Sequence, residues 1–265
     1  MNTVLNKYQL LEEIGRGSFS IIYKSKDIYT DKLCAIKIEP KPTNVKVSKD
    51  ANPIPFIVRE AHIHNRLTDV PEIPRLLWFG FDRDYYYMVL PLFVGTFRIL
   101  QYNLETSKEA WIHAGNDMLR AVMALHHRGY IHRDIKPDNF MFDDRGKVYL
   151  IDLGLCKQYL RNGGRHIPPR PRTGLIGTIN YISVNVHNLM EPSRRDDVES
   201  VCYVLWKMCG GLDWDIQESD GLEETSTIKS CKMRLTAHKD LPIELLRLLM
   251  KTRVLAYDEA PCYEF

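Results

Sequence analysis

The densest group of reactive side chains in the sequence lies in IHRDIKPDNF, residues 131–140. This stretch contains an aspartate, a lysine and an asparagine that could take part in catalysis, Asp134, Lys136 and Asn139. A carboxylate can accept the proton of a hydroxyl group, an ammonium group can offset negative charge, and an amide oxygen can bind a divalent cation. So polar a stretch predicts either a solvated loop or a reaction site. Segments elsewhere in the chain decide between these two interpretations.

A second group of residues could hold a phosphate chain. Gly15 and Gly17 in IGRGSFSIIY let backbone amides approach phosphate oxygens, although such a pair alone is typical of a simple hairpin turn. Lys37 lies between apolar residues in CAIKI, where a buried ammonium group needs an acidic partner, and Glu60 on the next predicted helix can supply one. Asp152 opens the sequence DLG after an apolar strand.

The order of these motifs predicts phosphoryl transfer from a nucleotide. The polar stretch has the pattern H-R-D-x-x-x-x-N, and Lys37 has the alanine-any-lysine context used to hold nucleotide phosphates. We expect Asp134 to accept the proton of an attacking hydroxyl group, and Asn139 with Asp152 to bind Mg²⁺. Lys136 would offset charge on the transferred phosphate.

Local patterns predict the elements that carry these motifs. Short runs rich in β-branched and aromatic residues, bounded by glycine or polar turns, predict antiparallel strands. Apolar residues that repeat at three and four positions predict helices, and Gly129 should end the helix before the polar stretch. The predicted strands are 8–15, 20–28, 33–39, 85–90 and a short one within 147–154, and the predicted helices are 56–67, 106–128, 196–209 and 241–255.

Strands followed by helices predict an α+β fold, with a small β-rich N-terminal lobe and a larger helical C-terminal lobe. We expect one domain over residues 1–265, with lobes at 1–90 and 97–265 joined by a hinge at 91–96. Residues 40–55, with four prolines and no periodicity, predict a loop.

Composition and charge limit the class of protein. Apolar residues make up 45% and charged residues 26% of the chain, as in soluble globular domains. The 36 basic and 34 acidic residues leave a net charge of +2, which gives no reason to expect nucleic acid or a membrane as a partner. The sequence shows no signal peptide, no run of about 18 apolar residues and no zinc-type cysteine spacing. We therefore expect an intracellular monomer, cytoplasmic or nuclear or both, with its six cysteines reduced.

Beyond these motifs, the sequence resembles the eukaryotic protein kinases, and among them the casein kinase I family. The closer resemblance lies in HRDIKPDNF at 132–140, GTINYISVN at 177–185 and SRRDDVES at 193–200. SVN at 183–185 resembles the stretch that replaces Ala-Pro-Glu in this family, and RHIPPRPRTGLIGT resembles its activation segment. The vaccinia-related and tau-tubulin kinases share parts of the pattern. The resemblance extends from about residue 8 to the carboxyl end.

The resemblance implies a bilobal protein kinase fold, ATP and Mg²⁺ as cofactors, and transfer to serine or threonine hydroxyl groups of protein substrates. It implies a catalytic set of Asp134, Lys136, Lys37 and Glu60, and a metal-binding pair of Asn139 and Asp152. The implied nucleotide-binding set is Ile14, Gly15, Gly17, Ser18, Ser20, Ile22, Ala35, Lys37, Leu90, Leu92, Phe93 and Met141.

Some of these residues receive particular roles from the resemblance. Leu90 would be the gatekeeper, and Leu92 and Phe93 would bind adenine through their backbone. Asp197 would anchor the catalytic loop from its helix. Lys136 and the Gly177-Thr178 pair resemble those of serine/threonine kinases, so tyrosine is not the implied acceptor.

Several positions depart from the family pattern. Ser20 replaces the third glycine of the loop, and Leu153 replaces a phenylalanine. His64 lies one turn after Glu60, where an apolar residue is expected, and its burial would make packing there sensitive to pH. Asn180 replaces an arginine of the family's anion pocket, so a preference for phosphate-primed substrates is not implied. A basic group could instead meet acidic substrates or form a solvated loop: Arg161, Arg165, Arg170 and Arg172.

The leading hypothesis is an active kinase, and two other classes compete with it. A pseudokinase would keep the fold as a binding or scaffold module without transferring phosphate. Loss of Lys37, Asp134 or Asp152 would favour that class, and all three residues are present. A nucleotide hydrolase or small-molecule kinase is disfavoured because GTINYISVN resembles a peptide-binding surface.

Overall fold

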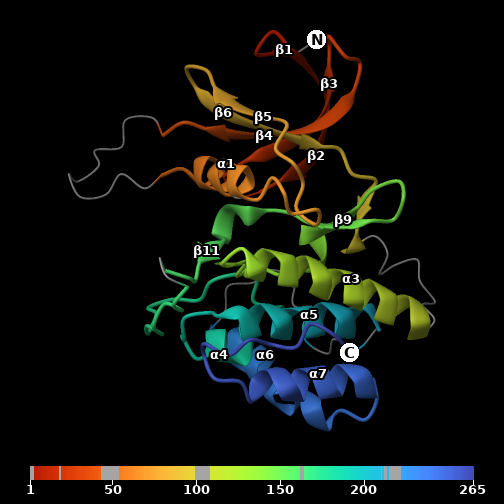
Figure 1. The fold of residues 1–265 in the computed structure, drawn as a ribbon, viewed down its shortest axis with the longest axis vertical. Coiled ribbons are helices and arrows are strands. Elements are labelled where there is room, and N and C mark those ends of the chain that lie inside the picture. The colour runs from red at the N-terminus through yellow and green to blue at the C-terminus, as the bar shows by residue number, and fades with distance from the viewer. Residues whose placement is uncertain are drawn as a thin grey trace. The chain divides into compact units, whose positions relative to one another are not determined.

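The computed structural model divides the chain into two compact units (Figure 1). The first comprises Met1–Val94 with Asp152–Gly154, and the second comprises Gly95–Ile151 with Leu155–Phe265. The predicted lobe and hinge bounds stay a prediction. The structure describes residues 3–17, 19–42, 54–98, 108–161, 164–209, 211, 214 and 222–265.

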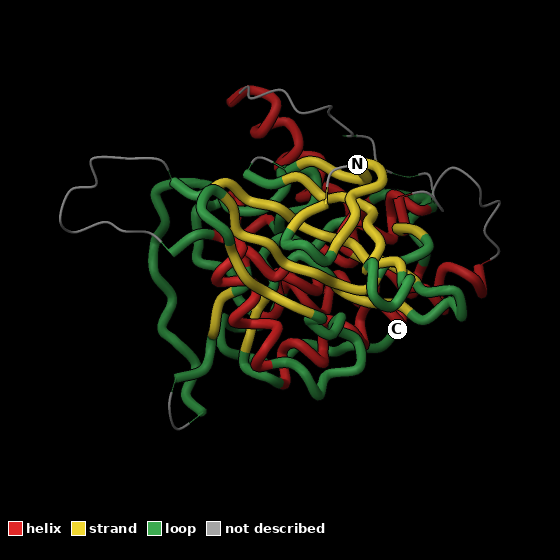
Figure 2. The backbone as a smooth tube through the Cα atoms, turned by 90° about the horizontal axis from the view of Figure 1, so that it is seen from above, coloured by secondary structure: helices red, strands yellow, loops and turns green. Residues whose placement is uncertain are grey.

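The first unit is built on a six-stranded antiparallel sheet with the strand order β1-β2-β3-β4-β6-β5. Figure 2 shows its strands side by side as a curved sheet. Hairpin connections link β2, β3 and β4, as the turn residues between the predicted strands indicate. The strands are β1 (Thr3–Val4), β2 (Tyr8–Arg16), β3 (Ile21–Asp27), β4 (Leu33–Pro40), β5 (Trp78–Phe81) and β6 (Tyr85–Pro91).

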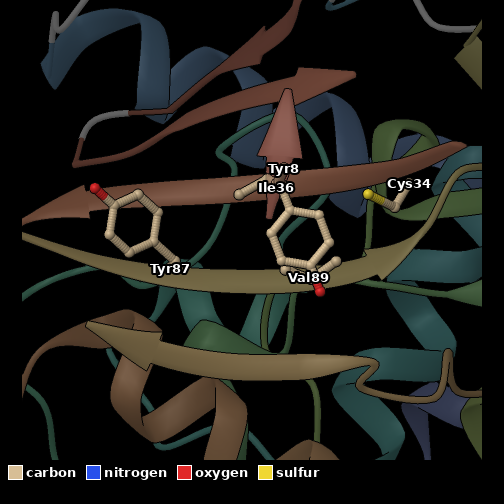
Figure 3. Close-up of a cluster of buried hydrophobic side chains, with 5 residues drawn as sticks. All are labelled: Tyr8, Cys34, Ile36, Tyr87 and Val89. Carbon is tan, nitrogen blue, oxygen red and sulfur yellow. The ribbon is translucent and has the colours of Figure 1, made fainter. Parts of the chain in front are cut away.

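One face of this sheet carries a buried apolar cluster. Successive strand residues point to opposite faces, so Cys34 and Ile36 of β4 share this face. There they join Tyr8, Tyr87 and Val89 in one cluster, in which every member is buried (Figure 3). Burial of this face fixes the register of β4 and thereby the direction of its alternate residues.

The opposite face of the sheet carries helix α1 (Phe56–Arg66). Ile57 and Ala61 of this helix form a buried cluster with Met88 of β6. Met88 lies directly across from Lys37 in the strand register. The lysine therefore projects from the face that the helix covers.

The second unit is mainly helical. In Figure 1, α3 lies against α5 and α5 lies against α7. Helix α5 is buried along almost its whole length, because other helices pack on both sides of it. The helices are α3 (Lys108–His127), α4 (Val184–His187), α5 (Arg194–Met208), α6 (Leu222–Arg234) and α7 (Ile243–Arg253).

Short strands and turns complete the second unit. Strands β7, β9 and β10 form one small antiparallel sheet, and β8 pairs with β11. The strands are β7 (Gly95–Thr96), β8 (Tyr130–Ile131), β9 (Phe140–Phe142), β10 (Val148–Leu150) and β11 (Lys157–Gln158), and single 3-10 turns lie at Pro137–Asn139 and Leu235–Ala237. A further 3-10 turn, Leu153–Leu155, begins in the first unit.

The predicted fold class, α+β with a β-rich first part and a helical second part, is confirmed. Gly129 follows α3 with a φ of 82°, a conformation that ends helices and suits glycine. The start of the helix predicted at residue 106 lies outside the described residues. Within the described part of the chain, no helix combines the length and the apolar character needed to cross a membrane.

Candidate active site

The first unit brings together three charged side chains. The Lys37 Nζ atom lies 2.7 Å from Glu60 Oε2 and 3.2 Å from Asp152 Oδ1. Burial alone would lower the pKa of the Lys37 ammonium, but Glu60 and Asp152 outweigh burial, so the pKa is raised and Lys37 is charged. Burial raises the pKa of the Glu60 carboxylate. The positive charge of Lys37 is the main effect that acts against this rise.

Glu60 has a second donor from the DLG sequence. The backbone N–H of Leu153 donates to its carboxylate, and the Leu153 side chain is fully buried. A Cβ atom at Gly154 would lie 3.4 Å from Asp152 Oδ1 and 3.8 Å from Glu60 Oε2. Leu153, which replaces the phenylalanine of the family pattern, is therefore accommodated as a buried apolar residue.

Four of the residues expected to bind the nucleotide lie near Lys37 in the strand register of the same unit. In the strand register Ile22 pairs with both Gly15 and Lys37, and Ala35 pairs with Leu90. Directly opposed residues share a face, so these side chains follow one another across the face that carries Lys37.

The other residues expected to bind the nucleotide lie at the edges of this region or elsewhere. The Gly17 N–H donates to the Ser20 carbonyl at 2.8 Å and closes the glycine-rich turn. Ile14 is 46% exposed. Leu92 and Phe93 follow β6 and are half-buried. The others are Ser18, which lies outside the described residues, and Met141, which lies on β9 of the second unit.

The second unit holds Asp134 in a hydrogen-bonded position. Asp134 Oδ1 accepts from the Thr178 backbone N–H at 2.9 Å and from the Thr178 hydroxyl at 2.7 Å. Lys136 Nζ lies 3.0 Å from the other oxygen, Oδ2. The Asn139 amide nitrogen donates to the Asp134 carbonyl at 2.8 Å. Asp134 is therefore both fixed and placed beside a cation.

Asp197, in the first turn of α5, holds the backbone of this loop. Its Oδ2 accepts from the His132 N–H at 2.7 Å, and its Oδ1 accepts from the Arg133 N–H at 2.9 Å. Burial would raise the pKa of Asp197, but the hydrogen bond with His126 at 2.9 Å and the nearby imidazoles lower it. Arg133 has a φ of 69°. These bonds hold the loop in an unusual backbone conformation.

Gly177 allows close approach to this loop. A Cβ atom there would lie 2.5 Å from the Arg133 carbonyl oxygen, and the residue has a φ of 92°. Glycine is therefore required next to Thr178, whose backbone and hydroxyl bind Asp134.

The contacts of Glu191 were not predicted from the sequence. Its carboxylate lies 2.8 Å from Lys157 Nζ, 3.4 Å from Arg172 Nη1 and 3.7 Å from Arg133 Nη1. Burial raises its pKa, but the cations, Lys157 first, lower it overall. Arg172 thus has an internal partner, whereas Arg161, Arg165 and Arg170 are exposed. Asn180 accepts from the Trp214 indole N–H through its backbone oxygen at 3.1 Å.

The two residues expected to bind Mg²⁺ offer suitable atoms. The Asp152 side chain is 41% exposed and presents a carboxylate, and the Asn139 amide nitrogen makes bonds to Asp134 that leave its oxygen as a ligand atom. Within the described ranges, no group of three or more histidine, cysteine or acidic side chains could hold a metal ion. The metal-binding pair stays a prediction.

Comparisons with known proteins give results that agree with this geometry. Residues 8–254 match the family described as protein kinase domain. A probable casein kinase I homolog of Encephalitozoon cuniculi (strain GB-M1) is 36% identical to this chain over 209 residues. The match covers 75% of this chain and 61% of the relative. The chain therefore spans only about three fifths of the length of that relative.

Proposed function

Because this chain belongs to the protein kinase family, we propose that it is an active kinase that transfers the γ-phosphate of Mg-ATP to serine or threonine hydroxyl groups of proteins. The observation that carries this proposal is the ion pair between Lys37 and Glu60, 2.7 Å apart and largely buried. Burying such a charge pair costs free energy, because both charges are removed from water. Its presence therefore indicates a role in binding or catalysis. It supports an active kinase over a pseudokinase scaffold.

The proposed role of the first unit is to hold the nucleotide. Lys37, oriented by Glu60, would bind the α- and β-phosphates, and the glycine-rich turn would offer backbone N–H groups to phosphate oxygens. Asp152 of this unit would offer a carboxylate oxygen to Mg²⁺, and Asn139 of the second unit would offer its amide oxygen. When bound, Mg²⁺ would neutralise charge that develops on the phosphate oxygens.

The proposed role of the second unit is to prepare the acceptor. The Asp134 carboxylate would orient the substrate hydroxyl and accept its proton, because Thr178 and Lys136 fix its two oxygens. Lys136 would then offset charge on the transferred phosphate. The serine/threonine assignment and a preference for acidic substrates rest on the similarity to casein kinase I and on the exposed arginines.

The first test replaces Asp134 with asparagine, which keeps the side-chain volume but removes the proton acceptor. We expect transfer of labelled phosphate from Mg-ATP to casein and to serine peptides to fall at least about 100-fold. Asp144→Asn, which changes an exposed acid of the same unit, is the matched control and should keep full activity. Phosphoamino acid analysis of the product identifies the acceptor residue. Measurable ATP binding without transfer by the unaltered protein would replace this proposal with the scaffold function.

A second test addresses the metal ligand. Asp152→Ala should lower Mg²⁺-dependent transfer by at least about 100-fold, because it removes a carboxylate ligand for the ion. The measurement is the initial rate over a Mg²⁺ titration, with Asp144→Ala as the control. An unchanged Mg²⁺ dependence would remove Asp152 from the proposed metal site.

A further inference from the structure

Helix α1 begins without a cap of its own. Its N-cap residue is Pro55, which makes no side-chain hydrogen bond, and its first turn contains no acidic residue. The first N–H groups of a helix have no partner within the helix, and they carry partial positive charge. A helix that carries Glu60 into the candidate active site therefore needs a partner for its first turn from another element.

Glu39 of β4 supplies that partner. Its Oε2 accepts from the backbone N–H of Ile57 at 3.0 Å. The Glu39 side chain is buried, with 7% of its surface exposed. Burial raises the pKa of this carboxylate, and the hydrogen bond from Ile57 and the charge of Lys37 act against that rise.

The position of Glu39 on the strand relates it to the candidate active site. Glu39 comes two residues after Lys37, so both side chains point to the sheet face that α1 covers. On the helix, Ile57 and Glu60 are three residues apart and share a face. Strand β4 therefore holds α1 at two successive points, first through Glu39 and then through Lys37. With the Lys37–Glu60 ion pair alone, the helix could rotate about that contact. The second contact, from Glu39 to Ile57, prevents this rotation.

The same end of the helix contacts the glycine-rich turn. Phe56, the first residue of α1, stacks on Phe19 with ring centroids 5.4 Å apart and an interplanar angle of 17°. A shift of the first helical turn would therefore move the surface on which the glycine-rich turn rests.

We propose that Glu39 is a positioning residue for nucleotide binding. It fixes the first turn of α1, so that Glu60 reaches Lys37 and Phe56 supports the glycine-rich turn. The inference rests on the proposed function, because it assigns Glu39 a role in holding the nucleotide through Lys37. A cap that serves only the stability of the unit would lower the melting temperature without a selective effect on ATP.

The test compares Glu39→Ala with Glu39→Gln. Alanine removes the acceptor, whereas glutamine keeps a carbonyl oxygen for the Ile57 N–H and removes only the charge. We expect the KM for ATP to rise about tenfold in Glu39→Ala, which loses the whole charged hydrogen bond to Ile57. In Glu39→Gln, which loses only the charge, we expect a rise of about threefold. The KM for the peptide should stay unchanged in both. Glu12→Ala, an exposed acid of the same sheet, is the control.

A double-mutant cycle with Glu60→Gln tests whether Glu39 acts through the ion pair. If it does, Glu39→Ala should add less than about twofold to the loss of ATP affinity already caused by Glu60→Gln, because coupled residues are not additive. Full additivity, or equal rises in the KM for ATP and for the peptide, would overturn the inference. If Glu39→Ala does not fold, the same cycle with Glu39→Gln decides.

The design separates this inference from the proposed function. If the unaltered protein transfers no phosphate, the proposed function fails, and the cycle is measured as the dissociation constant of ATP. Coupling between Glu39 and Glu60 in ATP binding would then still support the positioning role, and its absence would refute it.

Discussion

The two groups of candidate catalytic residues are held in different ways. In the first unit, Lys37 contacts Glu60 and Asp152, which are 23 and 115 positions away along the chain. In the second unit, Asp134 contacts Lys136 and Asn139 of its own loop and accepts two hydrogen bonds from Thr178, which is 44 positions away. The first arrangement depends on one charge neutralising another, and the second depends on donors placed around one acid.

This difference indicates how each region should fail. Removal of one member of a buried ion pair leaves an uncompensated charge, which costs more than loss of a neutral hydrogen bond. In the second region, a single substitution should lower the free energy of unfolding by less, because several separate hydrogen bonds hold its backbone.

The largest effect should follow from breaking the ion pair. Lys37→Met leaves the buried Glu60 carboxylate without its nearest cation, so we expect the free energy of unfolding to fall by about 4 kcal/mol at pH 7. The double variant Lys37→Met with Glu60→Met should recover most of that loss. Urea denaturation measures both. A loss below about 1 kcal/mol for the single variant would show that the pair behaves like a surface salt bridge.

An intermediate effect is expected in the second region. Asp197→Ala leaves the backbone N–H groups of His132 and Arg133 without their acceptor, and we expect a loss of about 3 kcal/mol in the free energy of unfolding. Phosphate transfer should fall with it, because the loop that carries Asp134 loses its anchor. Asp144→Ala serves as the control. Unchanged stability and activity would mean that the loop holds its conformation without α5.

The smallest effect concerns pH and sharpens the description of the first region. His64 on α1 is buried, its Nδ1 lies 2.9 Å from the Pro74 carbonyl oxygen, and its Nε2 has no partner in the described part of the chain. Burial lowers the pKa of His64 from 6.5 to about 4. The unfolded chain therefore binds a proton more readily, so stability is full above pH 6.5 and is lost as pH falls towards 4.

We expect His64 to account for about 2 kcal/mol of lost stability between pH 7 and pH 5. His64→Leu should reduce the pH dependence of the unfolding free energy by that amount in urea denaturation at the two pH values. His126 and His187 also have lowered pKa values, so the difference between the variant and the unaltered protein is the relevant quantity. Parallel pH profiles would contradict the assignment.

The pattern of apolar residues was sufficient to predict most of the longer elements of the fold. The predicted strands 8–15, 20–28, 33–39 and 85–90 agree with β2, β3, β4 and β6 within one or two residues, and helix 56–67 agrees with α1. Strand β5 was missed because WFGF is short and contains a glycine. Helix α6 was missed because its sequence, rich in serine and threonine, has no clear apolar stripe.

The contacts of the candidate site were predictable where one residue demanded a partner. A lysine in an apolar strand requires an acid, and this requirement identifies Glu60 as a partner of Lys37 from the sequence alone. Glu39 gave the same kind of signal, an acid two residues further along a buried strand, but its contact with α1 was not predicted. Glu191 gave none, because its three basic partners come from separate segments of the chain. The roles of these residues stay proposals.

The first unit is discontinuous along the chain, and this affects how it can be completed during synthesis. Its sheet and α1 lie within Met1–Val94, but Asp152–Gly154 belong to it as well. On the ribosome the sheet can form first, whereas Lys37 receives its second acidic partner, and Glu60 its Leu153 donor, only after residue 154 has emerged. The lysine centre is therefore assembled late, and a fragment that ends at Val94 would contain the sheet with an unfinished site.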